Sequence, residues 1–448
     1  MLSGQNQKRL KIGIIGTGIS GMSAAWLLSK SHDVTVFEKD DRVGGHSNTV
    51  DIAGTGVDTG FIVYNEKNYP NLIALFDHLC VATQETDMSF GVSRDRGDFE
   101  YAGSDLFGML AQKKNILRPR FWLMVRDIMR FYKAANLLLE SNNVPDITLG
   151  EYLKREGYSD SFQQDHLLPM GAAIWSTPVE TMMDYPLEAF IRFCDNHGLL
   201  QLSDRPKWRT VVGGSQRYIS KLTNNFKDSI SLNRGVAKVW QSGNKVCLED
   251  RNGTTERFDH LVMACHADQS LKLLSDADAA EKKLLSAFSY QPNIAILHQD
   301  ENYMPKNRKA WSSWNYLSET TSDTQDVCVT YWMNKLQHIK GDEDYFVTLN
   351  PIETPDESKI IRSFLYHHPL FNRDAIAAQR MLWNIQGKRN IWFCGSYFGH
   401  GFHEDGLQAG LAVAEALGGV KRPWIVDDES SRINLPIDWP HRISRVAA

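Results

Sequence analysis

The chain has 448 residues, 42% of them hydrophobic and 23% charged, which is ordinary for a globular protein and allows two or three domain-sized units. A net charge of −5 and an isoelectric point near 6.3 argue against a nucleic-acid-binding surface. No apolar run reaches the roughly 18 residues of a membrane span, and the polar start lacks the apolar core of a signal peptide, so we expect a cytoplasmic protein.

The first fifty residues carry the pattern of a nucleotide-binding βαβ unit. Residues 11–15 predict a short buried strand, residues 22–29 a helix and residues 33–37 a second strand. A Gly-X-Gly-X-X-Gly turn joins the first strand to the helix. We expect this turn and the start of the helix to contact a dinucleotide through Gly16, Gly18, Ile19, Ser20 and Gly21.

Each glycine has a physical role in such a turn. Gly16 permits the tight turn out of the strand, Gly18 lets a pyrophosphate approach the backbone, and Gly21 lets the helix pack close to the sheet. The helix N-terminus offers free N–H groups and a partial positive charge to the phosphates. Glu38 lies about twenty residues further on, where an acid accepts hydrogen bonds from the adenosine ribose. With strand, helix and acid in place, a dinucleotide site is favoured over a turn that binds nothing.

The remaining elements predict a chain that alternates between two domains. Helices are predicted over residues 72–79, 119–140, 149–156 (with Thr148 as N-cap), 216–225 and 405–417. Strands are predicted over residues 235–240, 245–249, 257–264, 294–298, 311–317, 327–334, 362–367 and 390–394, with a hairpin at Asn252-Gly253.

These elements divide the chain into interleaved segments. We expect a cofactor-binding domain from residues 1–69, 206–284 and 386–420. A mostly helical region, 70–205, and a sheet, 285–385, would form the substrate domain. The tail, 421–448, is expected to wrap the surface or fray.

In this order the segments resemble the flavin-dependent amine oxidase and phytoene desaturase superfamily, and more narrowly a bacterial group of NAD/FAD-binding, amine-oxidase-like proteins. The resemblance spans residues 11 to about 419. It implies an α/β fold, with a Rossmann-type FAD-binding domain and a second α+β substrate domain. By resemblance, further FAD contacts fall on Lys39, Arg42, Gly44, Gly45, His46, Thr59, Gly60, Phe61, Val236, Gly395, Ser396, Asp405, Gly406 and Leu407.

The chain departs from the family pattern in ways that bear on chemistry. Many amine oxidases carry a lysine near the flavin on the strand that here spans residues 293–298, and this strand has none. In the family, the glycine of the last FAD-binding segment, here Gly395, is usually followed by an acid. In this chain Ser396 follows it. Some relatives attach FAD through a cysteine upstream of the closing motif. Because no cysteine lies between Cys328 and Cys394, we predict non-covalent FAD.

Aromatic side chains are the candidates for the walls of a substrate cavity, although each could equally pack in the core. The candidates for substrate contact are Tyr64, Asn65, Trp175, Trp314, Tyr316, Tyr331, Trp332 and Tyr397.

Metal ligation is not expected. The six cysteines are scattered without Cys-X-X-Cys spacing, so neither a zinc site nor a redox disulfide is indicated. His400, His403 and Glu404 fall inside the closing segment, where packing or hydrogen bonding is the better interpretation. His403 as a proton-transfer group is a minor hypothesis. His298, His367 and His368 are interpreted as structural histidines of strands.

The helix predicted over residues 119–140 has a basic stripe, formed by Arg126, Arg130 and Lys133. This stripe is either a solvated face of a packed helix or a peripheral membrane contact beside the substrate entrance.

Three functions remain open on the sequence. The preferred one is an FAD-dependent oxidoreductase that removes or relays hydride from a C–H bond of an apolar substrate, an unsaturated fatty acyl chain or isoprenoid, by desaturation or isomerisation. The alternative enzyme is a flavin amine oxidase acting on a primary amine or polyamine, whose cation Glu85 and Asp87 could hold. The third hypothesis is a non-catalytic flavin-binding sensor.

Overall fold

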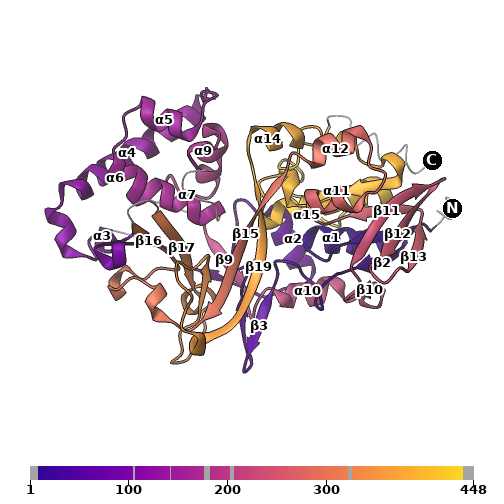
Figure 1. Cartoon of the computed structure of the whole chain (residues 1–448), viewed down its shortest axis with the longest axis horizontal. Coiled ribbons are helices and arrows are strands. Elements are labelled where there is room, and N and C mark those ends of the chain that lie inside the picture. Colours follow the sequence, from indigo (N-terminus) through magenta and orange to yellow (C-terminus); the bar gives the residue numbers. More distant parts are fainter. Residues whose placement is uncertain are drawn as a thin grey trace.

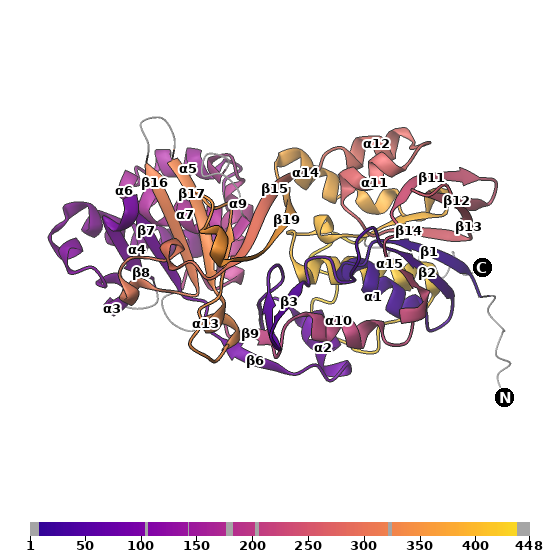
Figure 2. The ribbon, with the colours of Figure 1, turned by 60° about the horizontal axis from the view of Figure 1, so that its bottom comes forward.

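The structure is a computed structural model that describes residues 9–103, 106–141, 143–175, 182–201, 206–320 and 325–436. Figure 1 shows two lobes, with the first and last described residues, 9 and 436, on the same lobe. The long antiparallel pair of β15 (Ser289–His298) and β19 (Ile360–Leu370) lies where the lobes meet (Figures 1 and 2).

The lobe with residues 9 and 436 is built on a parallel sheet. Within the described residues its order is β10 (Ile230–Ser231), β2 (Asp33–Phe37), β1 (Lys11–Ile15), β14 (His260–Met263) and β20 (Ile391–Phe393). The strands come from three separate stretches of the chain. This confirms the predicted α/β fold of interleaved segments. Helices α1 (Ile19–Leu28) and α15 (His403–Gly418) pack against one another in this lobe.

One predicted strand proves to be two. Residues 257–264 divide between two strands, β13 (Thr255–Phe258) and β14. Strand β13 lies in an antiparallel sheet with β11 (Val236–Ser242) and β12 (Lys245–Asp250), whereas β14 lies in the parallel sheet. Asp259 lies between the two strands and accepts a hydrogen bond from the backbone N–H of Lys11 at 2.8 Å. The chain therefore changes sheet at Asp259. The Asn252-Gly253 hairpin between β12 and β13 is confirmed.

The second lobe is α+β. Its sheet has the order β19, β15, β18 (Phe346–Leu349), β17 (Gln325–Trp332), β16 (Trp314–Thr320), β7 (Phe90–Arg94) and β8 (Phe99–Ala102). Residues 70–205 were predicted mostly helical, yet they supply β7 and β8, because β7 pairs in parallel with β16. The core of this lobe forms between the sheet and helices α4 (Pro119–Glu140), α7 (Leu168–Trp175) and α9 (Leu187–Asn196).

Shorter elements complete the fold. The strands are β3 (Thr49–Ile52), β4 (Thr55–Asp58), β5 (Tyr64–Asn65), β6 (Thr83–Thr86) and β9 (Trp208–Val211). The helices are α2 (Pro70–His78), α3 (Leu106–Met109), α5 (Leu149–Arg155), α6 (Asp160–Phe162), α10 (Gln216–Thr223), α11 (Ala267–Leu273), α12 (Ala279–Leu285), α13 (Met333–Gln337) and α14 (Arg373–Gln379). The predicted N-cap, Thr148, forms a capping box with Glu151. None of the helices in the described ranges is long and apolar enough to cross a membrane.

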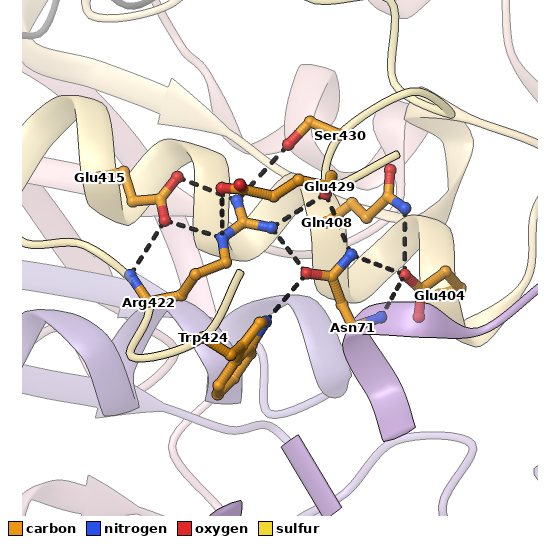
Figure 3. A network of polar contacts seen from close by, with 8 residues as sticks. All are labelled: Asn71, Glu404, Gln408, Glu415, Arg422, Trp424, Glu429 and Ser430. Carbon is orange, nitrogen blue, oxygen red and sulfur yellow. Dashed lines mark hydrogen bonds and ion pairs between the residues drawn. The ribbon is translucent and has the colours of Figure 1, made fainter. Parts of the chain in front are cut away.

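The tail is anchored as far as residue 436. The buried side chain of Arg422 pairs with Glu415 of α15 through two contacts of 2.8 and 2.9 Å. Its Nη1 also donates to Asn71 of α2, which Glu404 and Trp424 contact as well (Figure 3). This part of the tail therefore wraps the surface and does not fray. Residues 437–448 lie outside the described part of the chain.

Candidate active site

A cavity of about 1290 Å³ is lined by residues of both lobes. One end lies over the first turn of α1, and the other lies among α4, α7, α9 and the sheet of the second lobe. A cavity of this size has room for a dinucleotide with a substrate beside it.

The glycine turn forms the first end of the cavity. Gly16, Gly18, Ile19 and Ser20 line it, and Gly16 has a φ of +104°, which favours glycine. A Cβ on Gly18 would meet no atom within 4 Å, so the space above this residue is open. Gly21 faces away from the cavity, and a Cβ there would lie 2.0 Å from the carbonyl oxygen of Gly16. The glycines therefore stand where a pyrophosphate could reach the N-terminus of α1.

Glu38 follows directly after β2 and lines the same wall, with Lys39 and Val236. Its buried carboxylate accepts hydrogen bonds from the backbone N–H of Thr17 and of Asp40, both at 3.0 Å. These contacts fix the carboxylate at the edge of the cavity, where the predicted ribose contact would be made.

The loop from Arg42 to His46 folds back over the glycine turn. Arg42 donates from Nη2 to the carbonyl of Gly45 at 2.8 Å, whereas its buried Nη1 and Nε2 of His46 have no hydrogen-bond partner among the described residues. A Cβ on Gly45 would lie 3.0 Å from Cα of Gly18. Gly44 turns inward and does not line the cavity. A buried guanidinium nitrogen without a partner, beside a helix N-terminus, fits the anionic pyrophosphate of FAD.

Thr59, Gly60 and Phe61 continue the cavity wall. The N–H of Phe61 donates to the carbonyl of His46 at 2.7 Å, and a Cβ on Gly60 would lie 2.3 Å from that oxygen. The hydroxyl of Thr59 lies 2.8 Å from that of Tyr366, whose ring stacks on His46 at 4.9 Å. Strand β19 thus holds this segment against the loop.

His403 is a fixed, neutral side chain. Its ring stacks on Phe61 at 3.8 Å, and Nε2 lies 2.5 Å from the hydroxyl of Tyr218 and 3.2 Å from that of Ser47. Burial lowers the pKa of His403 to about 3. Glu404 turns away to Asn71 of α2. Among the described residues, no group of three His, Cys, Asp or Glu side chains is placed to hold a metal ion.

The last predicted FAD-binding segment, from Gly395 to Leu407, lines the cavity only with its earlier residues. Gly395, Ser396 and Tyr397 line the cavity, and α15 begins at His403, two residues before the predicted start. The expected contacts Asp405, Gly406 and Leu407 are buried and do not line it. Asp405 pairs with Arg432 at 2.7 Å, while a Cβ on Gly406 would lie 2.8 Å from Oγ of Ser20. These residues therefore pack α15 against the tail and α1.

Three of the predicted substrate-contacting residues line the cavity: Trp314, Tyr331 and Tyr397. Trp332 follows Tyr331 directly and so projects from the other face of β17, where its Nε1 donates to Asp344 at 2.8 Å. Tyr316 is fully buried in the core beneath the helices.

The remaining candidates lie elsewhere. Tyr64 is buried against Tyr69 and Phe76. Asn65 accepts hydrogen bonds from the backbone and side chain of Asn68. The side chain of Trp175, at the end of α7, lies outside the described part of the chain.

Sequence reasoning missed most of the helical wall. The cavity residues it did not select include Tyr132, His166, Met170, Phe193, His197 and Trp208. These lie on α4, α7, α9 and neighbouring segments, and nothing in their local pattern separates them from core positions. The stacked pair Phe193–His197, at 3.8 Å, has the i, i+4 spacing of one helix face, which is the only signal available.

Both carboxylates at the substrate end already face a lysine. Glu85 lies 3.6 Å from Nζ of Lys207, and Asp87 lies 3.3 Å from Nζ of Lys335. Burial opposes ionisation of Asp87, but hydrogen bonds from Ser89 and the charge of Lys335 outweigh it and lower its pKa. Each carboxylate at this end therefore already has a cation beside it, although the pair of Glu85 and Lys207 is exposed to solvent.

Comparison with known proteins identifies a family for this arrangement. The model of the flavin containing amine oxidoreductase family matches residues 19–337. A protein named as a flavin-containing monoamine oxidase of Mycobacterium tuberculosis is 23% identical over 328 residues, covering 71% of this chain and 69% of its own.

Solved structures share the fold. A CLA-producing fatty acid isomerase from P. acnes has a TM-score of 0.63 at 16% identity and covers 92% of this chain and 98% of its own. The cyclohexylamine oxidase of Brevibacterium oxydans has a TM-score of 0.64 at 15% identity, with 91% and 99% covered. At these identities the likeness extends to the fold alone.

Proposed function

Because the chain belongs to the flavin-containing amine oxidoreductase family, we propose that this FAD-dependent oxidoreductase removes or relays hydride from a C–H bond of an apolar substrate. The substrate would be an unsaturated fatty acyl chain or an isoprenoid, and the reaction desaturation or double-bond isomerisation. The isoalloxazine ring of non-covalently bound FAD would be the hydride acceptor. Contact with a membrane surface, where such substrates reside, belongs to the same proposal.

The wall of the second lobe carries the proposal. Trp314, Tyr331, Phe193 and Met170 line it, and the carboxylates at this end face lysines. An apolar chain loses no hydrogen bonds on entering such a cavity and gains the burial of its surface. The aromatic rings would orient the chain and exclude water from the reacting bond.

The cofactor end supports the same function. Arg42 and the first turn of α1 would hold the pyrophosphate, and the N-terminus of α15 brings a partial positive charge to the cavity. His403 stays neutral between Tyr218 and Ser47 at neutral pH. It would therefore orient neighbouring groups and would not act as a cationic proton donor.

The amine oxidase alternative has support of its own from the relative in Mycobacterium tuberculosis. It requires a site for a substrate amine, and the lysine partners of Glu85 and Asp87 argue against one. Membership of an oxidoreductase family favours an enzyme over the sensor hypothesis.

Product analysis tests the proposal. The FAD-loaded protein is incubated with a total lipid extract, and the lipids are analysed by mass spectrometry. Loss of two hydrogens would support desaturation, and a displaced double bond at unchanged mass would support isomerisation. If the lipids are unchanged and hydrogen peroxide forms when a primary amine or polyamine is added, the amine oxidase alternative would be favoured instead.

A further inference from the structure

The surface around α3 and α4 concentrates exposed apolar side chains. Phe107 is 87% exposed and Leu117 is 85% exposed. More than half of the large apolar side chains exposed in the described residues lie in this one stretch: Phe107, Ile116, Leu117, Trp122, Leu123, Met129 and Leu137. Figures 1 and 2 place α3 and α4 at the end of the molecule opposite β2 and β13.

The same stretch is strongly basic within an acidic chain. Residues 107–139 contain Lys113, Lys114, Arg118, Arg120, Arg126, Arg130 and Lys133, against a net charge of −5 for the whole protein. Asp127 is the one acid of this stretch, and it is buried and paired with Arg126 at 3.0 Å and Arg130 at 3.2 Å. Acids from outside the stretch also pair with it: Asp98 with Lys114 and Arg118, and Asp165 with Arg120. Lys113 and Lys133 are exposed and form no ion pair within the described ranges, so they are its free cations.

Apolar and basic side chains alternate along one face of α4. Trp122, Arg126, Met129, Lys133 and Leu137 follow one another at spacings of three and four residues, and all five are exposed. This face is not the uniformly polar face of a solvated helix. The opposite face is buried in the second lobe, and from it Tyr132 lines the cavity.

We propose that residues 107–139 dock the protein on an anionic lipid bilayer. Cations would meet the head groups, while Leu117, Trp122 and Met129 enter the boundary between head groups and acyl chains. Apolar side chains set singly between cations suit this boundary better than a protein partner, whose interface core is depleted of charge. Given the proposed function, docking would place the wall that carries Tyr132 next to the lipid that supplies the substrate.

Vesicle sedimentation tests the docking surface. The FAD-loaded protein is mixed with vesicles of phosphatidylcholine alone or with one third phosphatidylglycerol, at low and high salt. The variants are Lys113→Glu/Lys133→Glu and Leu117→Asp/Trp122→Asp. Matched controls, Lys227→Glu and Ile425→Asp, change exposed residues of the other lobe. Flavin content and circular dichroism establish that each variant is folded.

We expect sedimentation with anionic vesicles only, weakened by salt. Because each basic residue near an anionic surface contributes about 1 kcal/mol, the double charge reversal should lower the partition constant about thirty-fold or more. The Leu117/Trp122 variant should lose binding even at low salt, and the controls should bind like the parent protein. Absence of binding by the parent, equal binding by all variants, or a dimer lost in the variants without any vesicle binding would each overturn the proposal. Vesicle binding that persists while no lipid is converted would contradict the proposed function and leave the docking surface standing.

Discussion

Trp314 and Tyr331 lie directly opposite each other on the antiparallel strands β16 and β17, with ring centroids 5.6 Å apart and planes at 83°. Both side chains line the cavity, so this edge-to-face pair forms one rigid wall at its substrate end.

Replacing Trp314 by Ala should therefore weaken substrate binding and leave FAD in place. The loss of one cavity-lining indole and its ring contact predicts a rise in KM of about tenfold or more for whichever substrate reduces the flavin. The matched control is Trp332→Phe, on the opposite face of β17. An unchanged KM in Trp314→Ala, or equal effects of the two substitutions, would contradict the placement of this wall.

Two glycines of the nucleotide turn should respond differently to alanine. Gly18→Ala adds a methyl group where no atom lies within 4 Å, so the apoprotein should unfold at the same temperature while FAD binding is lost. Gly21→Ala would place its Cβ 2.0 Å from the Gly16 carbonyl oxygen and should destabilise the fold itself. Thermal unfolding without FAD and titration with FAD separate the two effects. Full FAD affinity in folded Gly18→Ala would show that the pyrophosphate binds elsewhere.

Arg42→Gln should lower FAD affinity without disturbing the fold. A charge-assisted hydrogen bond contributes about 1.5–3 kcal/mol, which predicts a Kd for FAD roughly ten- to a hundredfold higher. The measurement is equilibrium titration of the apoprotein with FAD, with exposed Arg308→Gln as control. Equal FAD affinities of the two variants would show that Arg42 does not contact the phosphates.

Histidines that line the cavity should make the fold sensitive to acid. Burial lowers the pKa of His403 to about 3 and, with a contribution from His367, those of His266 and His368 to about 4. The unfolded chain takes up protons near pH 6.5 and the fold does not, so stability is present above this pH and is lost as the pH falls towards 4. Each such group contributes about 1.4 kcal/mol per pH unit in this window.

Denaturant unfolding at several pH values between 7 and 4 measures this slope. Burial raises the pKa of Asp58 to about 6, which opposes the trend, so the comparison of the parent with His403→Gln isolates one histidine. The variant should have the shallower dependence. Identical slopes would mean that the pKa of His403 is the same in the folded and the unfolded protein.

The buried pair of Arg422 and Glu415 should be costly to break on one side only. Arg422→Met leaves the carboxylate of Glu415 buried without its cation and should lower the free energy of unfolding by about 3–5 kcal/mol. The double variant Arg422→Met/Glu415→Met should regain most of this loss. Additive losses in a double-mutant cycle would show that the two side chains do not interact.

The sequence predicts the cofactor domain better than the cavity. Strands β1 and β2 and helix α4 have their predicted bounds, because short buried strands, a glycine turn and a strongly periodic helix are local signals. The start of α15 was placed two residues late, since Phe402 offers no capping side chain of the usual polar type.

The cavity depends on tertiary packing, which local patterns do not contain. Alternation shows that Tyr331 and Trp332 face opposite sides of β17, but not which side is hollow. Trp314 and Tyr316 share a face by the same rule, yet helices cover only Tyr316. Likewise, apart from the i, i+4 spacing of Phe193 and His197, no local pattern indicates that His166 and His197 line a cavity.

Anaerobic absorbance of the bound flavin is the most direct test of hydride removal from an apolar substrate. The purified protein, loaded with FAD, is titrated first with lipid extracts and then with amines while the oxidised-flavin band is followed. Bleaching by a lipid fraction, and none by amines, is the predicted result for desaturation. Isomerisation returns the hydride to the lipid, so it would move a double bond in a lipid fraction without lasting bleaching. Bleaching by amines alone would contradict the apolar substrate, and a protein that takes up no FAD would contradict the account as a whole.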